Sequence, residues 1–144
     1  EGALRAEAGA PEEMIFLDTD CCSLMIRGGS KRLESRVRAV PPREVCISAV
    51  TRAELLYGLA RRPDAIRLVE LVQAFLSRVR SLAWSNDAAA HYAHIRAYFE
   101  ARGEPIGNMD QMIAAHARSV AVPLVTGNAR HFKRIPGLEI LDWA

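Results

Sequence analysis

The sequence lacks the features that mark secreted and membrane proteins. Only three of its 144 residues are cysteine; Cys21 and Cys22 are adjacent and Cys46 is distant, so they form no matched set of disulfides. No two cysteines have the C-x-x-C spacing of a structural zinc site. No apolar run approaches the roughly 18 residues that a membrane span requires. We therefore expect a soluble protein of the reducing cytoplasm.

The motifs of several large enzyme classes are also missing. No G-x-G-x-x-G follows the first apolar run and no Walker loop occurs, which argues against a dinucleotide or P-loop site. No serine lies in a G-x-S-x-G elbow, so acyl transfer is not supported. The histidines do not form a metal-binding pattern; they are His91, His94, His116 and His131.

Lysine is scarce, and arginine supplies most of the positive charge. Only Lys31 and Lys133 are lysines among 19 basic residues, and the formal net charge is +2. Because the planar guanidinium matches phosphate and carboxylate geometry, this bias favours RNA, DNA or an acidic protein surface as partner. A GC-rich coding bias explains it equally well, so both interpretations stay open.

The order of apolar runs predicts an α/β fold. Half of the residues are apolar, and short apolar runs alternate with segments of helical periodicity. We expect strands at 14–17, 45–48, 82–84, 124–126 and 138–141. We expect one helix to start at 18–20 and others to span 31–40, 49–62, 64–79, 85–102 and 107–120. Because the predicted strands are continuously apolar, a parallel sheet covered on both faces is indicated.

A single domain is expected over residues 14–144. Residues 1–13 are small, acidic and aperiodic, and Met14 looks like a natural start. We interpret 1–13 as an artificial remnant or a disordered extension. The sequence contains no repeat, no low-complexity tract and no internal linker.

Polar residues that follow the predicted strands are the candidates for a functional site. Asp18 and Asp20 follow the first strand, Glu54 lies beyond the second, Asp110 starts a late helix and Asn128 follows the strand at 124–126. In open parallel sheets, ligands bind beyond the carboxyl ends of the strands. A carboxylate joined directly to a buried strand, as Asp18 is, costs free energy to desolvate unless a positive group meets it.

Each of these acids also has an ordinary structural interpretation. Asp18 or Asp20 would cap the following helix, and Asp20 fits that role better. Thr51 and Glu54 have the spacing of a capping box, in which Glu54 only satisfies a backbone donor. Asp110 lies where a helix dipole favours any acid.

The number of acids favours a metal site over these separate roles. Carboxylates brought to one rim repel one another unless a cation lies between them. Mg²⁺ and Mn²⁺ prefer such oxygen ligands, and a bound ion of this kind activates water for phosphodiester cleavage. Arg130 and Lys133, just past Asn128, would then guide a nucleic-acid backbone toward the metal. The basic run over 27–43 is explained equally well as a solvated helix face.

The chain resembles the PIN-domain ribonucleases, and more narrowly the VapC-type toxins of bacterial toxin–antitoxin pairs. The resemblance covers the chain from Met14 to its end. It rests on these residues, in order: Leu17-Asp18-Thr19-Asp20, Ala53-Glu54-Leu55 with Tyr57-Gly58, Gly107-Asn108-Met109-Asp110-Gln111-Met112-Ile113-Ala114-Ala115-His116-Ala117, Val125-Thr126-Gly127-Asn128 with Phe132, Pro136-Gly137-Leu138 and Trp143.

The resemblance implies a three-layer α/β/α fold and a Mg²⁺- or Mn²⁺-dependent endoribonuclease. Asp18 and Asp110 would hold the metal, and Glu54 would complete the acidic cluster and orient the attacking water. Thr19 and Thr126 match supporting hydroxyl positions. The chain departs from the family at its fourth acidic position, where Asn128 offers an amide oxygen without charge, so the site would depend mainly on three acids.

The resemblance also implies partners. Members of the family form homodimers and are held inactive by a cognate antitoxin, and their substrate is structured RNA, tRNA among others. Two alternatives remain. One is a PIN scaffold that binds RNA or antitoxin with little catalysis, through the loss of charge at Asn128. The other is a phosphatase of the haloacid-dehalogenase type, whose D-x-D motif Asp18-Thr19-Asp20 matches.

Overall fold

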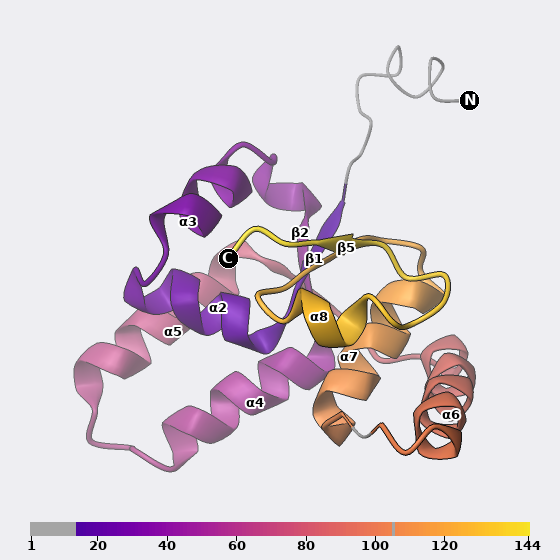
Figure 1. Ribbon diagram of the computed structural model, residues 1–144. Helices are drawn as coiled ribbons and strands as arrows, with labels where there is room; N and C mark the ends of the chain where they lie inside the picture. The colour runs from indigo at the N-terminus through magenta and orange to yellow at the C-terminus, as the bar shows by residue number, and fades with distance from the viewer. Residues whose placement is uncertain (1–13, 105) are drawn as a thin grey trace.

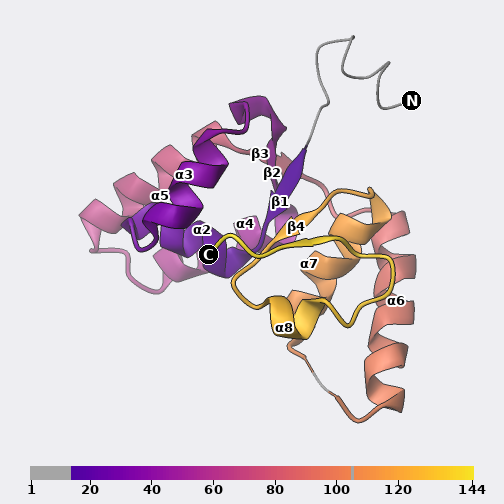
Figure 2. The ribbon, with the colours of Figure 1, turned by 45° about the horizontal axis from the view of Figure 1, so that its top comes forward.

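A computed structural model describes residues 14–104 and 106–144 of the chain, so the interpretation of residues 1–13 lies outside the described residues. The sheet has five strands in the order β3-β2-β1-β4-β5, and every neighbouring pair is parallel (Figures 1 and 2). The strands are β1 (Ile15–Leu17), β2 (Val45–Ser48), β3 (Arg80–Leu82), β4 (Leu124–Val125) and β5 (Ile140–Leu141). The predicted parallel α/β sheet is confirmed.

Helices cover both faces of this sheet. In the described residues they are α2 (Thr19–Arg27), α3 (Lys31–Arg38), α4 (Ala49–Ala60), α5 (Ile66–Arg78), α6 (Asn86–Ala101), α7 (Asn108–Ser119) and α8 (Ala129–Phe132), with a 3-10 turn η1 (Pro42–Glu44) before β2. Figures 1 and 2 show α2, α3 and α5 on one side of the sheet and α6, α7 and α8 on the other. The fold is therefore the three-layer α/β/α arrangement that the resemblance implied.

The central strands contribute side chains to two separate cores. Side chains alternate along a strand, so Ile15 and Leu17 of β1 pack with α2, α3 and α5, whereas Phe16 packs with α6 and α7. In β2, Ile47 belongs to the first core and Cys46 to the second. Because both faces of the central strands are buried, these strands read as continuous apolar runs.

Local signals set most helix ends. Serine side chains cap three helices by accepting a backbone N–H: Ser30 for α3, Ser48 for α4 and Ser85 for α6. Gly103 follows α6 with a φ of 62°, in the left-handed region, and so ends the helix as predicted.

The structure corrects two predictions of secondary structure. The strand expected at 82–84 is β3 at Arg80–Leu82, an exposed edge strand whose first two residues are polar, so no apolar run marked it. Trp84 instead donates its indole N–H to the carbonyl of Met112, at 3.0 Å. The short helix α8 was not predicted, because four residues carry no helical periodicity.

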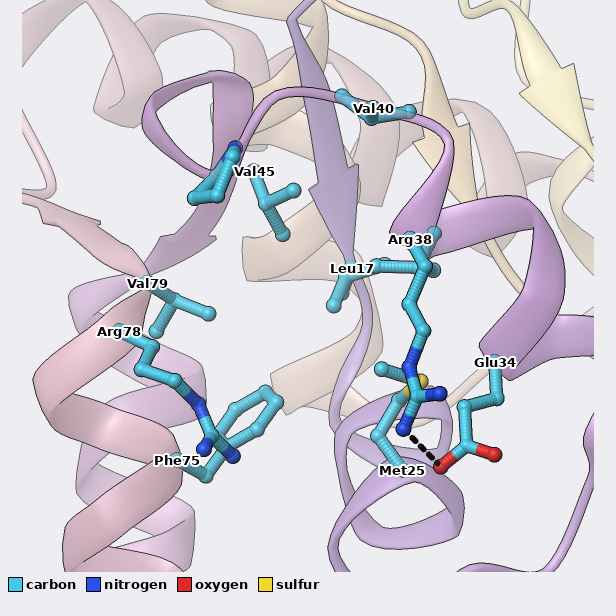
Figure 3. Close-up of a pocket in the computed structure, with 11 residues that line it drawn as sticks. Leu17, Met25, Glu34, Arg38, Val40, Val45, Phe75, Arg78 and Val79 are labelled. Carbon is cyan, nitrogen blue, oxygen red and sulfur yellow. Dashed lines mark ion pairs between the residues drawn. The ribbon is translucent and has the colours of Figure 1, made fainter.

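A cavity of about 350 Å³ lies on the α2, α3 and α5 side of the sheet (Figure 3). Its wall is mainly apolar, and Arg38 pairs with Glu34 beside it at 3.4 Å. None of the predicted acids lines this cavity. In the part of the chain that the structure describes, every helix is too short or too polar to cross a membrane.

Candidate active site

The order of the strands reverses direction between β1 and β4. The chain runs from β1 outward through β2 to β3, and then crosses back to form β4 on the other side of β1. The connections after β1 and β4 therefore leave in opposite directions, which is where open α/β sheets bind ligands. Asp18 directly follows β1 and Thr126 directly follows β4, and the Asp18 N–H donates to the carbonyl of Val125 at 3.1 Å.

Asp18 is a buried carboxylate at the start of α2. Its side chain is 3% exposed, and Oδ1 accepts the backbone N–H of Cys21 at 2.8 Å, so it does cap the helix. Burial raises the pKa of Asp18, while the Thr126 hydroxyl and the Cys21 N–H favour its ionised form. The cap occupies Oδ1, so capping and ligand binding are compatible roles for this residue.

Glu54 does not belong to a capping box. The N-cap of α4 is Ser48, whose hydroxyl accepts the N–H of Val50 at 3.1 Å. Glu54 instead accepts a hydrogen bond from the Thr19 hydroxyl at 2.5 Å, and the Thr19 and Thr51 hydroxyls lie 3.1 Å apart. This contact joins the first residue of α2 to α4 and turns Glu54 toward the edge where Asp18 lies.

Asp110 lies in the first turn of α7, where the charges of the other acids act on its carboxyl group. The N-cap of this helix is Gly107, without a side-chain hydrogen bond, so Asn108 does not cap it. Burial, followed by the charges of Asp18, Asp20 and Glu54, raises the pKa of Asp110 to about 6. Three carboxylates from two other segments of the chain therefore act on the charge of Asp110. Asp20 is exposed in the first turn of α2.

The acids fit a hard divalent cation by their chemistry. Repulsion from the other acids contributes to the raised pKa of Asp110, and a cation between the acids would relieve this repulsion. Across residues 14–104 and 106–144, no three Asp, Glu, His or Cys side chains lie close enough together to hold a metal ion by themselves. The oxygen-only donor set suits Mg²⁺ or Mn²⁺, which keep several waters and need few protein ligands.

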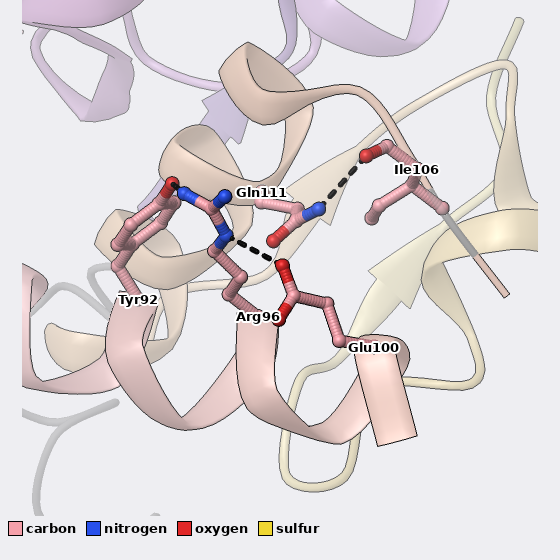
Figure 4. Close-up of polar contacts among 5 residues, drawn as sticks. All are labelled: Tyr92, Arg96, Glu100, Ile106 and Gln111. Carbon is pink, nitrogen blue, oxygen red and sulfur yellow. Dashed lines mark hydrogen bonds and ion pairs between the residues drawn. The ribbon is translucent and has the colours of Figure 1, made fainter. Parts of the chain in front are cut away.

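Two buried contacts that motif reasoning missed hold the helix bearing Asp110. Gln111, 5% exposed, donates its Nε2 to the carbonyl of Ile106 at 2.8 Å and so fixes the approach to α7 (Figure 4). Figure 4 also shows Arg96 of α6 bonded to Tyr92 and Glu100 beside this segment. At the other end of α7, His116 Nδ1 lies 2.7 Å from the Ser48 hydroxyl. The His116–Ser48 contact has no sequence signal, because it joins residues 68 positions apart, and the Gln111–Ile106 contact follows no capping motif.

The backbone of Asn128 forms hydrogen bonds that shape the loop after β4. Its N–H donates to the Thr126 hydroxyl at 2.8 Å, and its carbonyl accepts from the first turn of α8. Thr126 is fully buried beside Asp18, so Asn128 helps to hold the hydroxyl that favours the ionised Asp18. Arg130 and Lys133 are exposed on and just after α8, beyond this loop.

The chain is similar to known proteins over almost its full length. A family model described as PIN domain matches residues 15–138. The chain is 39% identical to the tRNA(fMet)-specific endonuclease VapC of Salmonella typhimurium, over 89% of this chain and 96% of that protein. It is 35% identical to ribonuclease VapC2 of Haemophilus influenzae, again over 89% of this chain and 96% of that protein.

Solved structures show the same relationship. The fold matches a DNA-bound VapBC from Salmonella typhimurium with a TM-score of 0.83 and 38% identity, covering 91% of this chain and 98% of that chain. It matches VapBC2 from Rickettsia felis, bound to a DNA fragment from its promoter, with a TM-score of 0.83 and 30% identity, covering 91% of this chain and 99% of that chain. The fold, the cluster of acids and these similarities together establish that the chain belongs to the PIN-domain family and, within it, to the VapC ribonucleases.

Proposed function

We propose that this protein is a divalent-metal-dependent endoribonuclease that cleaves tRNA and acts as the toxin of a type II toxin–antitoxin pair in the cytoplasm. The observation that carries the proposal is the electrostatic coupling of Asp110 to Asp18, Asp20 and Glu54 at the carboxyl edge of the sheet. The names of the VapC relatives support ribonuclease activity, and one of those names specifies tRNA(fMet) as the substrate of that relative.

Each residue of the proposed site has a separate role. Asp18, Asp110 and Glu54 would hold Mg²⁺ or Mn²⁺, which when bound lowers the pKa of water and neutralises charge on the phosphate. Thr19 holds Oε1 of Glu54, leaving Oε2 to orient the water that attacks the phosphodiester in line. The amide of Asn128 adds an uncharged polar group at the same edge, in agreement with a site that depends mainly on three acids.

The protein's proposed partners are a cognate antitoxin and a second copy of the chain. The VapBC structures that it resembles are complexes of relatives with antitoxins, which supports an antitoxin partner here. A homodimer agrees with two large apolar side chains left exposed on α4, Leu56 at 43% and Tyr57 at 64%. Arg130 and Lys133 are proposed to contact the RNA backbone near the acids.

A cleavage assay tests the proposed function. The purified protein, free of antitoxin, is incubated with bulk bacterial tRNA and Mn²⁺, with and without EDTA. Discrete tRNA fragments are expected with Mn²⁺. Their rate of formation should fall about 100-fold or more in EDTA, which removes the cation, and in Asp110→Asn, which removes one of the carboxylates proposed to bind it. Asp87→Asn, which changes an exposed acid in the first turn of α6, is the matched control and should cleave normally.

One alternative keeps a specific observation in its favour. Asn128 removes a charge from the fourth acidic position, which suits a scaffold that binds RNA or antitoxin with little catalysis. Binding of tRNA without cleavage, with either Mg²⁺ or Mn²⁺, would support that alternative. The phosphatase interpretation of Asp18-Thr19-Asp20 has lost its basis, because the PIN match accounts for this motif together with Glu54 and Asp110.

A further inference from the structure

A second cavity, of about 300 Å³, opens beside the acids on the outer side of α2 and α4. It is distinct from the cavity of Figure 3, which lies between α3 and α5. Three helices contribute to the walls of the second cavity. Its lining comprises Thr19, Ser23, Ile26 and Arg27 of α2, Glu54, Leu55, Gly58, Leu59, Arg61 and Arg62 of α4 and the residues just after it, and Leu68 and Val72 of α5.

Two helices present the same order of side chains along this cavity. On α2, Thr19 is followed by Ser23 and then by Arg27; these positions are four residues apart and share one helix face. On α4, Glu54 is followed by Gly58 and then by a pair of arginines. The Thr19–Glu54 hydrogen bond joins the two rows at their first members. The cavity therefore runs from the acids to the arginines, about 12 Å along each helix.

The arginines at the far end are available to an anion. Arg27, Arg61 and Arg62 are all exposed, and none forms an ion pair with a carboxylate of residues 14–104 or 106–144. Arg61 lies over the ring of Tyr57, with its guanidinium carbon 5.1 Å from the ring centroid, which holds that guanidinium in place. Three guanidinium groups without internal partners form a site for phosphate oxygens.

Between the acids and the arginines the wall is apolar and open. Ile26, Leu59 and Leu68 provide flat hydrocarbon surface. Gly58 has no side chain in the middle of the wall, and a Cβ added there meets no heavy atom within 4 Å. Glycine inside a helix is less favourable than alanine by about 1 kcal/mol, so the open space at Gly58 lowers the stability of α4.

We propose that this arginine-rimmed cavity, lined from Thr19 and Glu54 to Arg27, Arg61 and Arg62, binds the RNA strand next to the cleaved phosphodiester. The arginines bind backbone phosphates, and a nucleoside lies against the apolar wall at Gly58. The inference rests on the proposed ribonuclease function. An RNA strand fits better than an acidic polypeptide, because Glu54, which the proposed function places at the reacting phosphodiester, lines the other end of this cavity.

A salt titration tests the phosphate contacts without any cleavage. Fluorescein-labelled bulk tRNA is bound in EDTA to the wild type and to the triple variant R27A/R61A/R62A, and the dissociation constant is followed by fluorescence anisotropy. Three lost phosphate contacts should lower the slope of log Kobs against log[salt] by about 2 to 3 and weaken binding about 50- to 150-fold at 0.15 M salt. The control R36A/R78A/R102A removes equal charge from exposed positions outside the cavity and should leave the slope within about 1.

A pair of substitutions at Gly58 tests the apolar wall. Gly58→Ala and Gly58→Leu both improve helix propensity, so both should melt at or above the wild-type temperature. Gly58→Ala adds only a methyl group to the wall and should weaken tRNA binding slightly, by about two- to threefold, whereas Gly58→Leu fills the cavity and should weaken it about tenfold, in proportion to one lost nucleoside contact.

The outcomes separate this inference from the proposed function. An unchanged salt slope in the triple variant, or unaltered tRNA binding in a folded Gly58→Leu variant, would overturn the RNA site. Unchanged tRNA binding with weakened binding of polyglutamate would overturn it in favour of an acidic polypeptide. If the wild type fails to cleave tRNA with Mn²⁺ while the triple variant still loses the slope, the ribonuclease function fails and the RNA-binding site stands.

Discussion

At the scale of single residues, the site is set by the cost of gathering like charges. Asp110 is half-buried, and burial together with repulsion from three other carboxylates raises its pKa from 3.8 to about 6. Asp18 is more deeply buried, yet a backbone N–H and the Thr126 hydroxyl partly compensate it. Asp110 has no such hydrogen bond among those the structure shows, and it is therefore the acid on which a bound cation has the largest electrostatic effect.

The raised pKa of Asp110 predicts the stability of the metal-free protein. Because its folded pKa lies above its unfolded pKa of 3.8, this carboxyl costs nothing below pH 3.8 and destabilises the fold increasingly as the pH rises through about 6. Asp110→Asn should therefore raise the free energy of unfolding in EDTA at pH 7.5, by about 1 to 2 kcal/mol after allowance for solvent screening. Urea unfolding at pH 7.5 and at pH 4.5 measures the gain, which should shrink at the lower pH.

Asp87→Asn is the control for this measurement. Asp87 also lies in the first turn of a helix, α6, but it is exposed. Its replacement should lower stability slightly, by about 0.5 kcal/mol, because it only removes a favourable interaction with the helix dipole. Equal effects of the two substitutions would contradict the account of Asp110 as a carboxyl under repulsion.

At the scale of elements, buried polar contacts tie together the helices that carry the acids. Ser48 ends β2, caps α4 through the N–H of Val50 and meets His116 of α7. Burial lowers the pKa of His116, so its ring stays neutral. A neutral Nδ1 is able to accept a hydrogen bond from the Ser48 hydroxyl. One hydroxyl thus links the helix of Glu54 to the helix of Asp110.

Replacing Ser48 should therefore cost more than replacing an ordinary cap. Ser48→Ala removes the cap of α4 and leaves buried His116 Nδ1 without its partner, for an expected loss of about 2 to 4 kcal/mol in the free energy of unfolding. Ser85→Ala removes only the N-cap of α6, at an exposed position, and should cost about 1 kcal/mol. Urea unfolding of both variants provides the comparison, and similar losses would show that the His116 contact adds nothing.

At the scale of the whole molecule, the site is a consequence of strand order. The sheet places β4 directly beside β1, although more than a hundred residues separate them in the chain, and so brings Asp18 next to Thr126. Two further helices, α4 and α7, then carry Glu54 and Asp110. A ligand that bridges these acids would bind only the folded chain.

Metal binding should consequently stabilise the whole domain. At a Mn²⁺ concentration of 100 times its dissociation constant, the free energy of unfolding should increase by about 2.7 kcal/mol, or about 10 °C in melting temperature. Differential scanning fluorimetry with Mn²⁺ and with EDTA measures the shift at pH 7.5. It should be smaller at pH 5.5, because protons compete for Asp110 below its pKa of about 6.

The variant Asp18→Asn controls for binding elsewhere. It removes one charge from the edge where β1 and β4 meet and should lose most of the Mn²⁺-dependent shift. A shift as large as that of the wild type would place the metal outside this cluster.

The elements that the sequence predicted well are those with strong local signals. Strands β1 and β2 are continuous apolar runs, and α6 ends at Gly103, whose φ of 62° favours glycine. Strand β3 was misplaced by two residues because an exposed edge strand needs no apolar residues. The acids were proposed because they follow strands and match a family motif, and their role stays a prediction. The capping box at Thr51 and Glu54 was wrong, because the same spacing also fits a helix interior.

The sequence by itself determined the fold class and singled out the acids as candidates, since burial of strands and the ends of helices depend on neighbouring residues. Only the tertiary structure decided which partner each acid has, that Thr19 holds Glu54, that His116 meets Ser48, and that three arginines line a cavity leading to the acids. The Thr19–Glu54 and His116–Ser48 contacts join residues 35 and 68 positions apart, and no local pattern encodes them because they exist only when separate helices pack against one sheet.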